Sequence, residues 1–147
     1  MPAVATWRVD ARNNGFAEGK MKKIIATSAA PQAIGPYSQA VKAGGFLFLS
    51  GQIPLDPATG ELITGDIALQ ASRVMDNIAA VLAAAGLDFA AVVKTTIYLT
   101  DLAHFAVVNE VYGSRFAAAP PARSTVEVRG LPKGAQVEIE VVAACGN

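Results

Sequence analysis

Three ionisable groups on two predicted strands are the residues of this chain best suited to chemistry. Arg123 stands in the segment PPARSTVEV, where two prolines lead into an alternating pattern of apolar and polar residues. Glu138 and Glu140 stand in QVEIEVVAA, and alternate residues of a strand share one face of a sheet. A guanidinium binds a carboxylate through two parallel hydrogen bonds, and a carboxylate can orient a water molecule or move its proton. These groups predict a site for a small, amino-acid-derived molecule that carries a carboxylate.

Each of these residues also has a purely structural interpretation. Two like charges on a half-buried strand are costly unless one reaches solvent, so the glutamates also fit a solvated edge. Arg123 fits a surface ion pair that contributes less than about 1 kcal/mol. Tyr37, in GPYSQ, fits a loop anchor. The pattern alone leaves these alternatives open.

Other kinds of site find little support in the residue types. The chain has one histidine, His104, and one cysteine, Cys145, and therefore no cluster with metal-ligand spacing. The SGQ that begins at Ser50 is not a nucleophile elbow, and GKMKK lacks the glycine spacing of a phosphate loop. We expect no metal, no cofactor, and a solvated or capping His104.

The composition limits the class of protein. Hydrophobic residues make up 52% of the 147 residues and charged residues only 16%, against about 25% in typical soluble domains. So many apolar and so few charged residues suggest that apolar surface is buried between subunits, so we expect an oligomer. Twelve basic and twelve acidic residues leave no net charge, which argues against a nucleic-acid partner. The longest apolar stretch, Ile78–Leu87, is too short for a bilayer, and a single cysteine favours the cytosol.

The first twenty residues differ from the rest of the chain. They lack the sustained apolar segment that a secretory signal requires. Asp10 and Glu18 argue against a transit peptide. We interpret residues 1–20 as an extension dispensable for the fold. Met21 is a possible true start, and residues 21–147 are expected to form one domain.

The remaining pattern predicts six strands and two helices in the order β-β-β-α-β-α-β-β. Asp66 should cap the first helix and Gly86 should end it, and a second helix should cover about residues 103–116. The predicted strands are 22–27, two strands within 41–52 hinged at Gly44-Gly45, 92–101, 123–128 and 136–144. This order predicts an α+β two-layer sandwich with two helices on one face of a mixed sheet. Because the other face carries apolar residues and has no cover, we expect another subunit there and ligands in the clefts between subunits.

Five segments in this order resemble the reactive intermediate deaminase (Rid) family, formerly called the YjgF family. They span about residues 24–144 and read AIGPYSQAV, LFLSGQIPLDPATGEL, VKTTIYLTDLAHFAVVNEVY, PPARSTVEV and LPKGAQVEIEVVA. The resemblance implies a chorismate-mutase-like fold and a homotrimer with three sites in the subunit clefts. It also implies hydrolysis of 2-imino or 2-enamino acids to 2-keto acids and ammonia, without metal or cofactor. Such substrates are released by pyridoxal-phosphate enzymes such as serine/threonine dehydratases.

The resemblance also implies roles for individual residues. It assigns the substrate carboxylate to Arg123, closure of the pocket to Tyr37, and the attacking water to Glu140, and it leaves Glu138 structural. Where many bacterial relatives have cysteine this chain has Thr125, whose backbone groups can still bind the substrate. The substrate-binding positions carried over from the family are Ser50, Gly51, Asn109 and Thr125.

Three alternative functions are compatible with the same features. The main alternative is a non-catalytic trimer that binds small carboxylates or acts as a chaperone or regulator. A ribonuclease or translation inhibitor is disfavoured because the chain lacks a basic and aromatic surface. A chorismate-mutase-like isomerase would rest on fold analogy alone.

Overall fold

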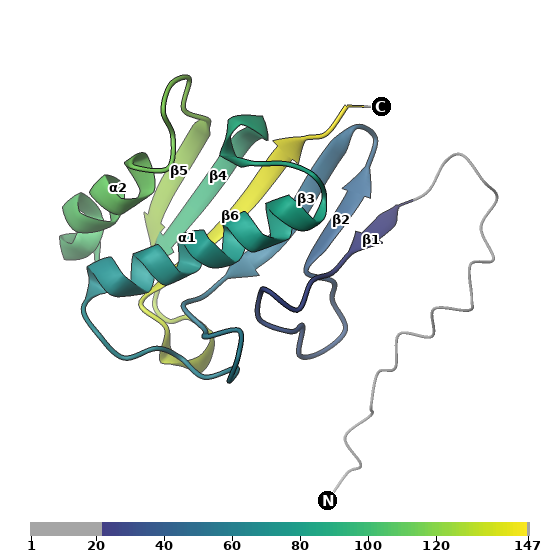
Figure 1. Cartoon of the computed structure of the whole chain (residues 1–147). Coiled ribbons are helices and arrows are strands. Elements are labelled where there is room, and N and C mark those ends of the chain that lie inside the picture. Colours follow the sequence, from purple (N-terminus) through teal and green to yellow (C-terminus); the bar gives the residue numbers. More distant parts are fainter. Residues whose placement is uncertain (1–21, 147) are drawn as a thin grey trace, which may run out of the picture.

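The computed structural model describes residues 22–146, so the predicted extension, residues 1–20, lies outside the described residues (Figure 1). The strands are β1 (Lys23–Ile25), β2 (Ala40–Ala43), β3 (Phe46–Gln52), β4 (Val92–Leu99), β5 (Ala122–Glu127) and β6 (Val137–Ala144). They form one sheet in the order β1-β2-β3-β6-β4-β5. Only β4 and β5 pair in parallel, and the other neighbours are antiparallel. The sheet is therefore mixed, as the sequence predicts.

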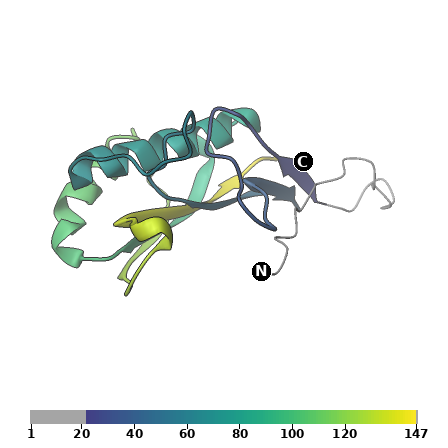
Figure 2. The ribbon, with the colours of Figure 1, turned by 90° about the horizontal axis from the view of Figure 1, so that it is seen from below.

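Two helices, α1 (Ile67–Ala84) and α2 (Phe105–Gly113), lie on the same face of this sheet. Figure 1 shows α1 crossing the strands, and the view from below in Figure 2 shows α1 and α2 on the same side of the sheet. The core lies between the two layers, where alternate residues of β3, β4 and β6 meet the apolar stripe of α1. Fully buried members of this core are Leu47, Ile97, Leu99, Val137 and Ile139 from the sheet and Val74, Met75, Ile78, Val81 and Leu82 from α1. The α+β two-layer architecture is confirmed.

The ends of α1 follow the local signals in the sequence. The Asp66 carboxylate accepts a hydrogen bond from the Leu69 amide at 2.9 Å, which satisfies one of the free amides of the first turn. Gly86, with φ of 74°, ends the helix while the Leu87 amide donates back to the Leu82 carbonyl. By length and hydropathy α1 also meets the criteria for a membrane span, but half of it is buried inside the protein, as in a core helix.

The second helix is shorter than the predicted range of 103–116. A 3₁₀ turn, η2 (Leu102–His104), precedes α2, and the helix stops at Gly113, where the Ser114 hydroxyl donates to the Val111 carbonyl at 2.6 Å. His104 therefore lies at the N-terminus of α2, where its side chain makes no capping hydrogen bond. Phe105, the first residue of α2, is 40% exposed. Its ring lies near the Arg123 guanidinium of β5, at the margin of the sheet.

The face of the sheet opposite the helices carries large apolar side chains in solvent. Ile24, Val41, Phe48 and Val142 are consecutive partners across β1, β2, β3 and β6. Ile24 and Phe48 are each 47% exposed, and the neighbouring Phe46 is 43% exposed. A contiguous row of this kind is typical of a surface that another chain covers. The predicted cover by a second subunit therefore remains the expectation for this face.

Candidate functional site

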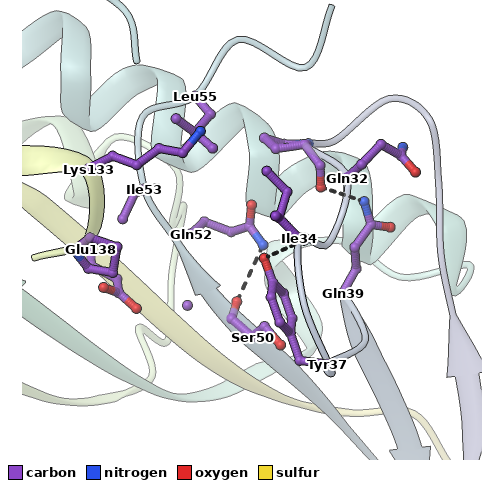
Figure 3. Close-up of a pocket in the computed structure, with 13 residues that line it drawn as sticks. Gln32, Ile34, Tyr37, Gln39, Ser50, Gln52, Ile53, Leu55, Lys133 and Glu138 are labelled. Carbon is purple, nitrogen blue, oxygen red and sulfur yellow. Dashed lines mark hydrogen bonds between the residues drawn. The ribbon is translucent and has the colours of Figure 1, made fainter. Parts of the chain in front are cut away.

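A cavity of about 510 Å³ lies where the loop before β2 meets the end of β3 and the start of β6 (Figure 3). We call it the Glu138 cavity. Figure 3 shows Glu138 and Tyr37 on opposite sides of it, and Ser50 at its foot. Three predicted site residues, Tyr37, Ser50 and Gly51, line this cavity together with Glu138. The other lining residues are Pro31, Gln32, Ile34, Gln39, Gln52, Ile53, Leu55, Pro132 and Lys133.

Hydrogen bonds from buried polar groups hold the wall that carries Tyr37. The buried Gln39 amide donates to the Pro31 carbonyl at 2.7 Å and accepts from the Thr27 amide at 2.6 Å. The Ser50 hydroxyl donates to the Ser38 carbonyl at 2.6 Å, which ties the same loop to β3. The Tyr37 hydroxyl accepts from the Ile34 amide at 3.2 Å. Its own proton therefore stays free to donate to a bound ligand.

The absence of a side chain at Gly51 leaves room for the side chain of Glu138. A Cβ built on Gly51 would lie 2.9 Å from Cδ of Glu138, which is closer than real Cβ contacts allow. The pairing of β3 with β6 also shifts register between Leu49 and Gln52, and such irregularities often lie next to functional sites. The missing side chain therefore lets the Glu138 carboxylate lie directly against the β3 backbone inside the cavity.

The environment of Glu138 favours its protonated form. Burial raises the pKa of this carboxyl above its ordinary value, and the negative charge of Glu140 raises it further. A carboxyl with a raised pKa exchanges its proton more readily near neutral pH, as a general base or acid requires. The glutamate in the cavity is therefore Glu138, to which the sequence interpretation gave only a structural role.

Glu140, to which the resemblance assigns the attacking water, does not line the Glu138 cavity of the single chain. Its side chain is exposed and accepts a hydrogen bond from the Tyr98 hydroxyl at 2.7 Å. This hydrogen bond raises the pKa of Tyr98. Glu138 and Glu140 do share one face of β6, as predicted, but of the two only Glu138 lines the cavity. The register between strands decided this, and the sequence does not state that register.

A second group of predicted residues surrounds Arg123, and we call it the Arg123 cluster. Nη1 of Arg123 donates to Oδ1 of Asn109 on α2 at 2.7 Å. The guanidinium carbon lies 5.1 Å from the ring centroid of Tyr112 and 5.6 Å from that of Phe105, within the range of cation–π attraction. Positions 105, 109 and 112 share one face of the helix, so α2 supplies a ready-made support for the guanidinium. The remaining N–H groups can bind a carboxylate.

Thr125 belongs to the same cluster. It stands two residues after Arg123 on β5 and therefore points to the same face of the sheet. A small space lined by Arg123, Asn109, Phe105 and Thr125 separates β5 from α2, with Ile97, Leu99 and Val108 at its base. Phe105 and Tyr112 are site residues that the sequence interpretation missed, although their spacing along α2 relative to Asn109 was a usable signal.

The two groups lie on opposite faces of the sheet. Arg123 pairs with Thr95, which is buried against α2, whereas Glu138 pairs with Tyr98 on the uncovered face. One small ligand cannot touch both groups of a single chain, because the sheet lies between them. The predicted site is therefore divided into two halves that only a second chain could bring together. Within residues 22–146, no group of three or more His, Cys, Asp or Glu residues could hold a metal ion.

Comparison with known proteins gives the class of this fold and site. The family model described as "Endoribonuclease L-PSP" matches residues 27–145. The protein DfrA of Myxococcus xanthus is 62% identical over 124 residues, which cover 83% of this chain and 95% of that protein. The 2-iminobutanoate/2-iminopropanoate deaminase of Bos taurus is 48% identical over 126 residues, which cover 86% of this chain and 92% of that protein.

A solved structure of similar sequence is the E. coli protein TdcF with bound serine. It superposes with a TM-score of 0.79 at 47% identity, covering 83% of this chain and 98% of that one. The chain therefore belongs to the Endoribonuclease L-PSP family, which is also the Rid or YjgF family.

Proposed function

We propose that the protein hydrolyses reactive 2-imino and 2-enamino acids to 2-keto acids and ammonia. The observation that carries this proposal is the Glu138 carboxyl, with its raised pKa, against Gly51 in a cavity that also contains Tyr37. The arginine supported by Asn109 supplies a carboxylate-binding group of the kind that such substrates need. Relatives named 2-iminobutanoate/2-iminopropanoate deaminase support the same activity.

The proposal includes a homotrimer in the cytosol, with each site shared between two chains. In this arrangement the Glu138 cavity of one chain faces the Arg123 cluster of its neighbour. The uncovered apolar face of the sheet supports such an assembly, as does the separation of the two half-sites by the sheet. The name of TdcF with bound serine supports a small amino-acid-like ligand in this family.

The chemistry begins with a substrate that is already electrophilic. Arg123 binds its carboxylate, and Tyr37 donates a hydrogen bond that fixes its orientation. Glu138 accepts a proton from a water molecule as the oxygen attacks the carbon of the protonated C=N group, whose π electrons move to nitrogen. The product of this step is a neutral carbinolamine, and Glu138 is now protonated.

The second half of the reaction returns the enzyme to its starting state. Glu138 donates its proton to the amino nitrogen, and the carbinolamine hydroxyl returns a proton to Glu138 as the C–N bond breaks. A 2-keto acid forms, and the departing ammonia takes the proton from Glu138 to leave as ammonium. One water is consumed for each substrate, and no oxidant, metal or covalent intermediate takes part.

A coupled assay tests the proposal directly. A serine/threonine dehydratase generates 2-aminocrotonate in solution, and keto-acid formation is followed with and without the full-length protein. Acceleration above the spontaneous rate is expected, and Glu138→Gln should remove it. If the purified protein gives no acceleration, the hydrolase proposal is wrong.

A second candidate is a non-catalytic binder of small carboxylates. The Arg123 cluster favours it, since the Asn109 contact and the two aromatic rings complete a carboxylate-binding group without Glu138. This candidate predicts that Glu138→Gln leaves every function unchanged, whereas the hydrolase depends on Glu138. Calorimetry with 2-oxobutanoate, run beside the coupled assay, separates the two.

A further inference from the structure

The hydroxyl of Thr125 is buried and has no hydrogen-bond partner. Its Oγ1 is one of the two buried side-chain polar atoms without a partner among the described residues, the other being Oε1 of Gln70. Native proteins rarely leave a buried hydroxyl unpaired, so each case asks for an explanation. Thr125 lies in the Arg123 cluster, at the half-site where the proposed function places the substrate carboxylate.

A neighbouring threonine has the usual arrangement. Thr95 on β4 is also buried beneath α2, and its hydroxyl lies 2.7 Å from the hydroxyl of Tyr112. The same layer of the protein therefore provides partners for hydroxyl groups where the fold requires them. Thr125 is the exception, although it stands on the adjacent strand β5, opposite Ile97.

The surroundings of Thr125 explain why nothing in the chain satisfies it. Ile97, Leu99 and Val108 form the base of the adjoining space and have no polar side-chain atoms. Asn109 also lines this space, and its Oδ1 accepts from Arg123, but its side chain makes no hydrogen bond with Thr125. The space is too small for a water molecule, so solvent does not pair with the hydroxyl either.

We propose that the Thr125 hydroxyl donates a hydrogen bond to the carboxylate of the bound substrate and that it becomes paired only in the complex. The inference rests on the proposed function for the ligand class, a small 2-imino or 2-keto carboxylate. Arg123 and Thr125 stand two residues apart on one face of β5, about 7 Å along the strand. A carboxylate on the guanidinium can bridge this gap with its second oxygen.

Access to the hydroxyl requires that the cover of the small space moves. This cover consists of the Arg123 guanidinium and the Phe105 ring, which lie 5.6 Å apart. Phe105 is 40% exposed, so one side of its ring borders solvent. When a ligand carboxylate binds Arg123, it contacts the guanidinium that forms one half of this cover. The same binding step therefore brings the carboxylate acceptor and exposes the Thr125 hydroxyl. Thr125 thereby becomes a specificity residue for the carboxylate end of the ligand.

An isosteric substitution separates this role from a structural one. Thr125→Val keeps the shape and removes the hydroxyl, and Thr125→Ser keeps the hydroxyl and removes the methyl group. Because the hydroxyl is unpaired in the free protein, Thr125→Val should unfold at the same temperature as wild type or higher. The matched control Thr95→Val removes a paired hydroxyl, leaves Tyr112 without its partner, and should unfold at a lower temperature.

Ligand binding is measured on the same proteins by calorimetry with 2-oxobutanoate. We expect Thr125→Val to weaken binding about 10- to 100-fold, as the loss of a hydrogen bond to a charged group does, and Thr125→Ser to stay close to wild type. If wild type binds 2-oxobutanoate but shows no imine hydrolysis, weaker binding by Thr125→Val upholds this inference while the hydrolase proposal fails.

Four results would overturn the inference. The first is equal affinity of Thr125→Val and wild type for 2-oxobutanoate, and the second is no binding of this acid by wild type. The third is a lower unfolding temperature of Thr125→Val, which would mean that the hydroxyl has a partner within the folded protein. The fourth is dissociation of the assembly by Thr125→Val in size-exclusion chromatography, which would place that partner in a neighbouring chain.

Discussion

The Glu138 cavity and the Arg123 cluster prepare two charged groups in different ways. The Glu138 carboxyl is partly desolvated beside a second negative charge, so its surroundings oppose its ionisation and raise its pKa. Arg123, in contrast, is held by an amide oxygen and lies against two aromatic rings, which all favour its charge. The first arrangement makes a group reactive, and the second makes a group a fixed binding point. Under the proposed function, proton transfer and substrate positioning are divided between opposite faces of one sheet.

The largest effect is expected from removal of the binding point. Arg123→Ala should lower kcat/KM for 2-aminocrotonate about 10²- to 10⁴-fold, because two charge-assisted hydrogen bonds to the carboxylate disappear. Unfolding temperature should change little, since Arg123 lies at the margin of the sheet. Arg129→Ala, at an exposed turn arginine outside both half-sites, is the matched control and should behave as wild type. Full activity of Arg123→Ala would remove the arginine from the proposed site.

Removal of the reactive group should have a similar effect on rate but, unlike Arg123→Ala, should also increase stability. Glu138→Gln should lower kcat about 10²- to 10⁴-fold, as expected for the loss of general acid–base catalysis. The matched control Glu140→Gln should keep kcat within a few-fold of the wild-type value. If Glu140→Gln were the inactive variant and Glu138→Gln the active one, the assignment from the family resemblance would be restored over that from the cavity.

The raised pKa of Glu138 also fixes the sign of the stability change. A carboxyl whose pKa is higher in the folded than in the unfolded protein favours folding when protonated, and this contribution is lost as pH rises through the folded pKa. At pH values above the ordinary pKa of glutamate, the cost of ionising Glu138 in the folded protein therefore lowers the stability of the fold. Glu138→Gln should raise the unfolding temperature at pH 7, and the difference should disappear below about pH 4, near the ordinary pKa of glutamate. Thermal unfolding at several pH values measures it.

Mixing the two inactive variants tests whether the halves come from different chains. Refolding or co-expressing Arg123→Ala with Glu138→Gln in equal amounts should restore about one quarter of the wild-type activity, if chains assemble at random. A site shared between neighbours then has one chance in four, roughly, of receiving an intact half from each chain. Each variant alone should stay inactive. No recovery in a verified mixed assembly would mean that both halves act within one chain.

The sequence predicted the architecture well because its signals are local. The cap at Asp66, the stop at Gly86 and the strand alternation at residues 137–144 each depend on neighbours within a few positions. The end of α2 and the exposure of Phe105 were less predictable, since they depend on where the helix meets the margin of the sheet.

The candidate site was predicted only in part because its geometry depends on strand pairing. Arg123 and Asn109 could be chosen together, and the structure joins them by a hydrogen bond. Glu138 and Glu140 look equivalent in the sequence, but in the structure Glu138 lines the cavity and Glu140 accepts a hydrogen bond from Tyr98. The contact of Glu138 with Gly51 has no sequence signal at all. The family resemblance led to Glu140 for this reason, whereas the cavity favours Glu138.

A smaller effect is expected from filling the space beneath the Glu138 carboxylate. Gly51→Ala places a methyl group 2.9 Å from Cδ of Glu138, so the carboxylate must move away from the β3 backbone. We expect a loss of kcat of about 10- to 100-fold from a misplaced general base, with the overall fold intact. Gly130→Ala is the control, because an added Cβ there meets no atom within 4 Å. Equal activity of the two variants would mean that the position of the carboxylate against Gly51 is not important.

The smallest effect concerns Glu140, whose charge contributes to the raised pKa of Glu138. Glu140→Gln removes this repulsion, so the pKa of Glu138 should fall and its ionised form should persist to lower pH. Since the acidic limb of the profile of kcat/KM against pH reports the base of the free enzyme, that limb should move to lower pH. Tyr98→Phe removes the hydrogen bond to Glu140 but keeps its charge, and it should leave the limb in place. A limb that stays unchanged in Glu140→Gln would mean that burial alone determines the proton affinity of Glu138, and a limb that moves to higher pH would contradict the electrostatic coupling of the two carboxylates.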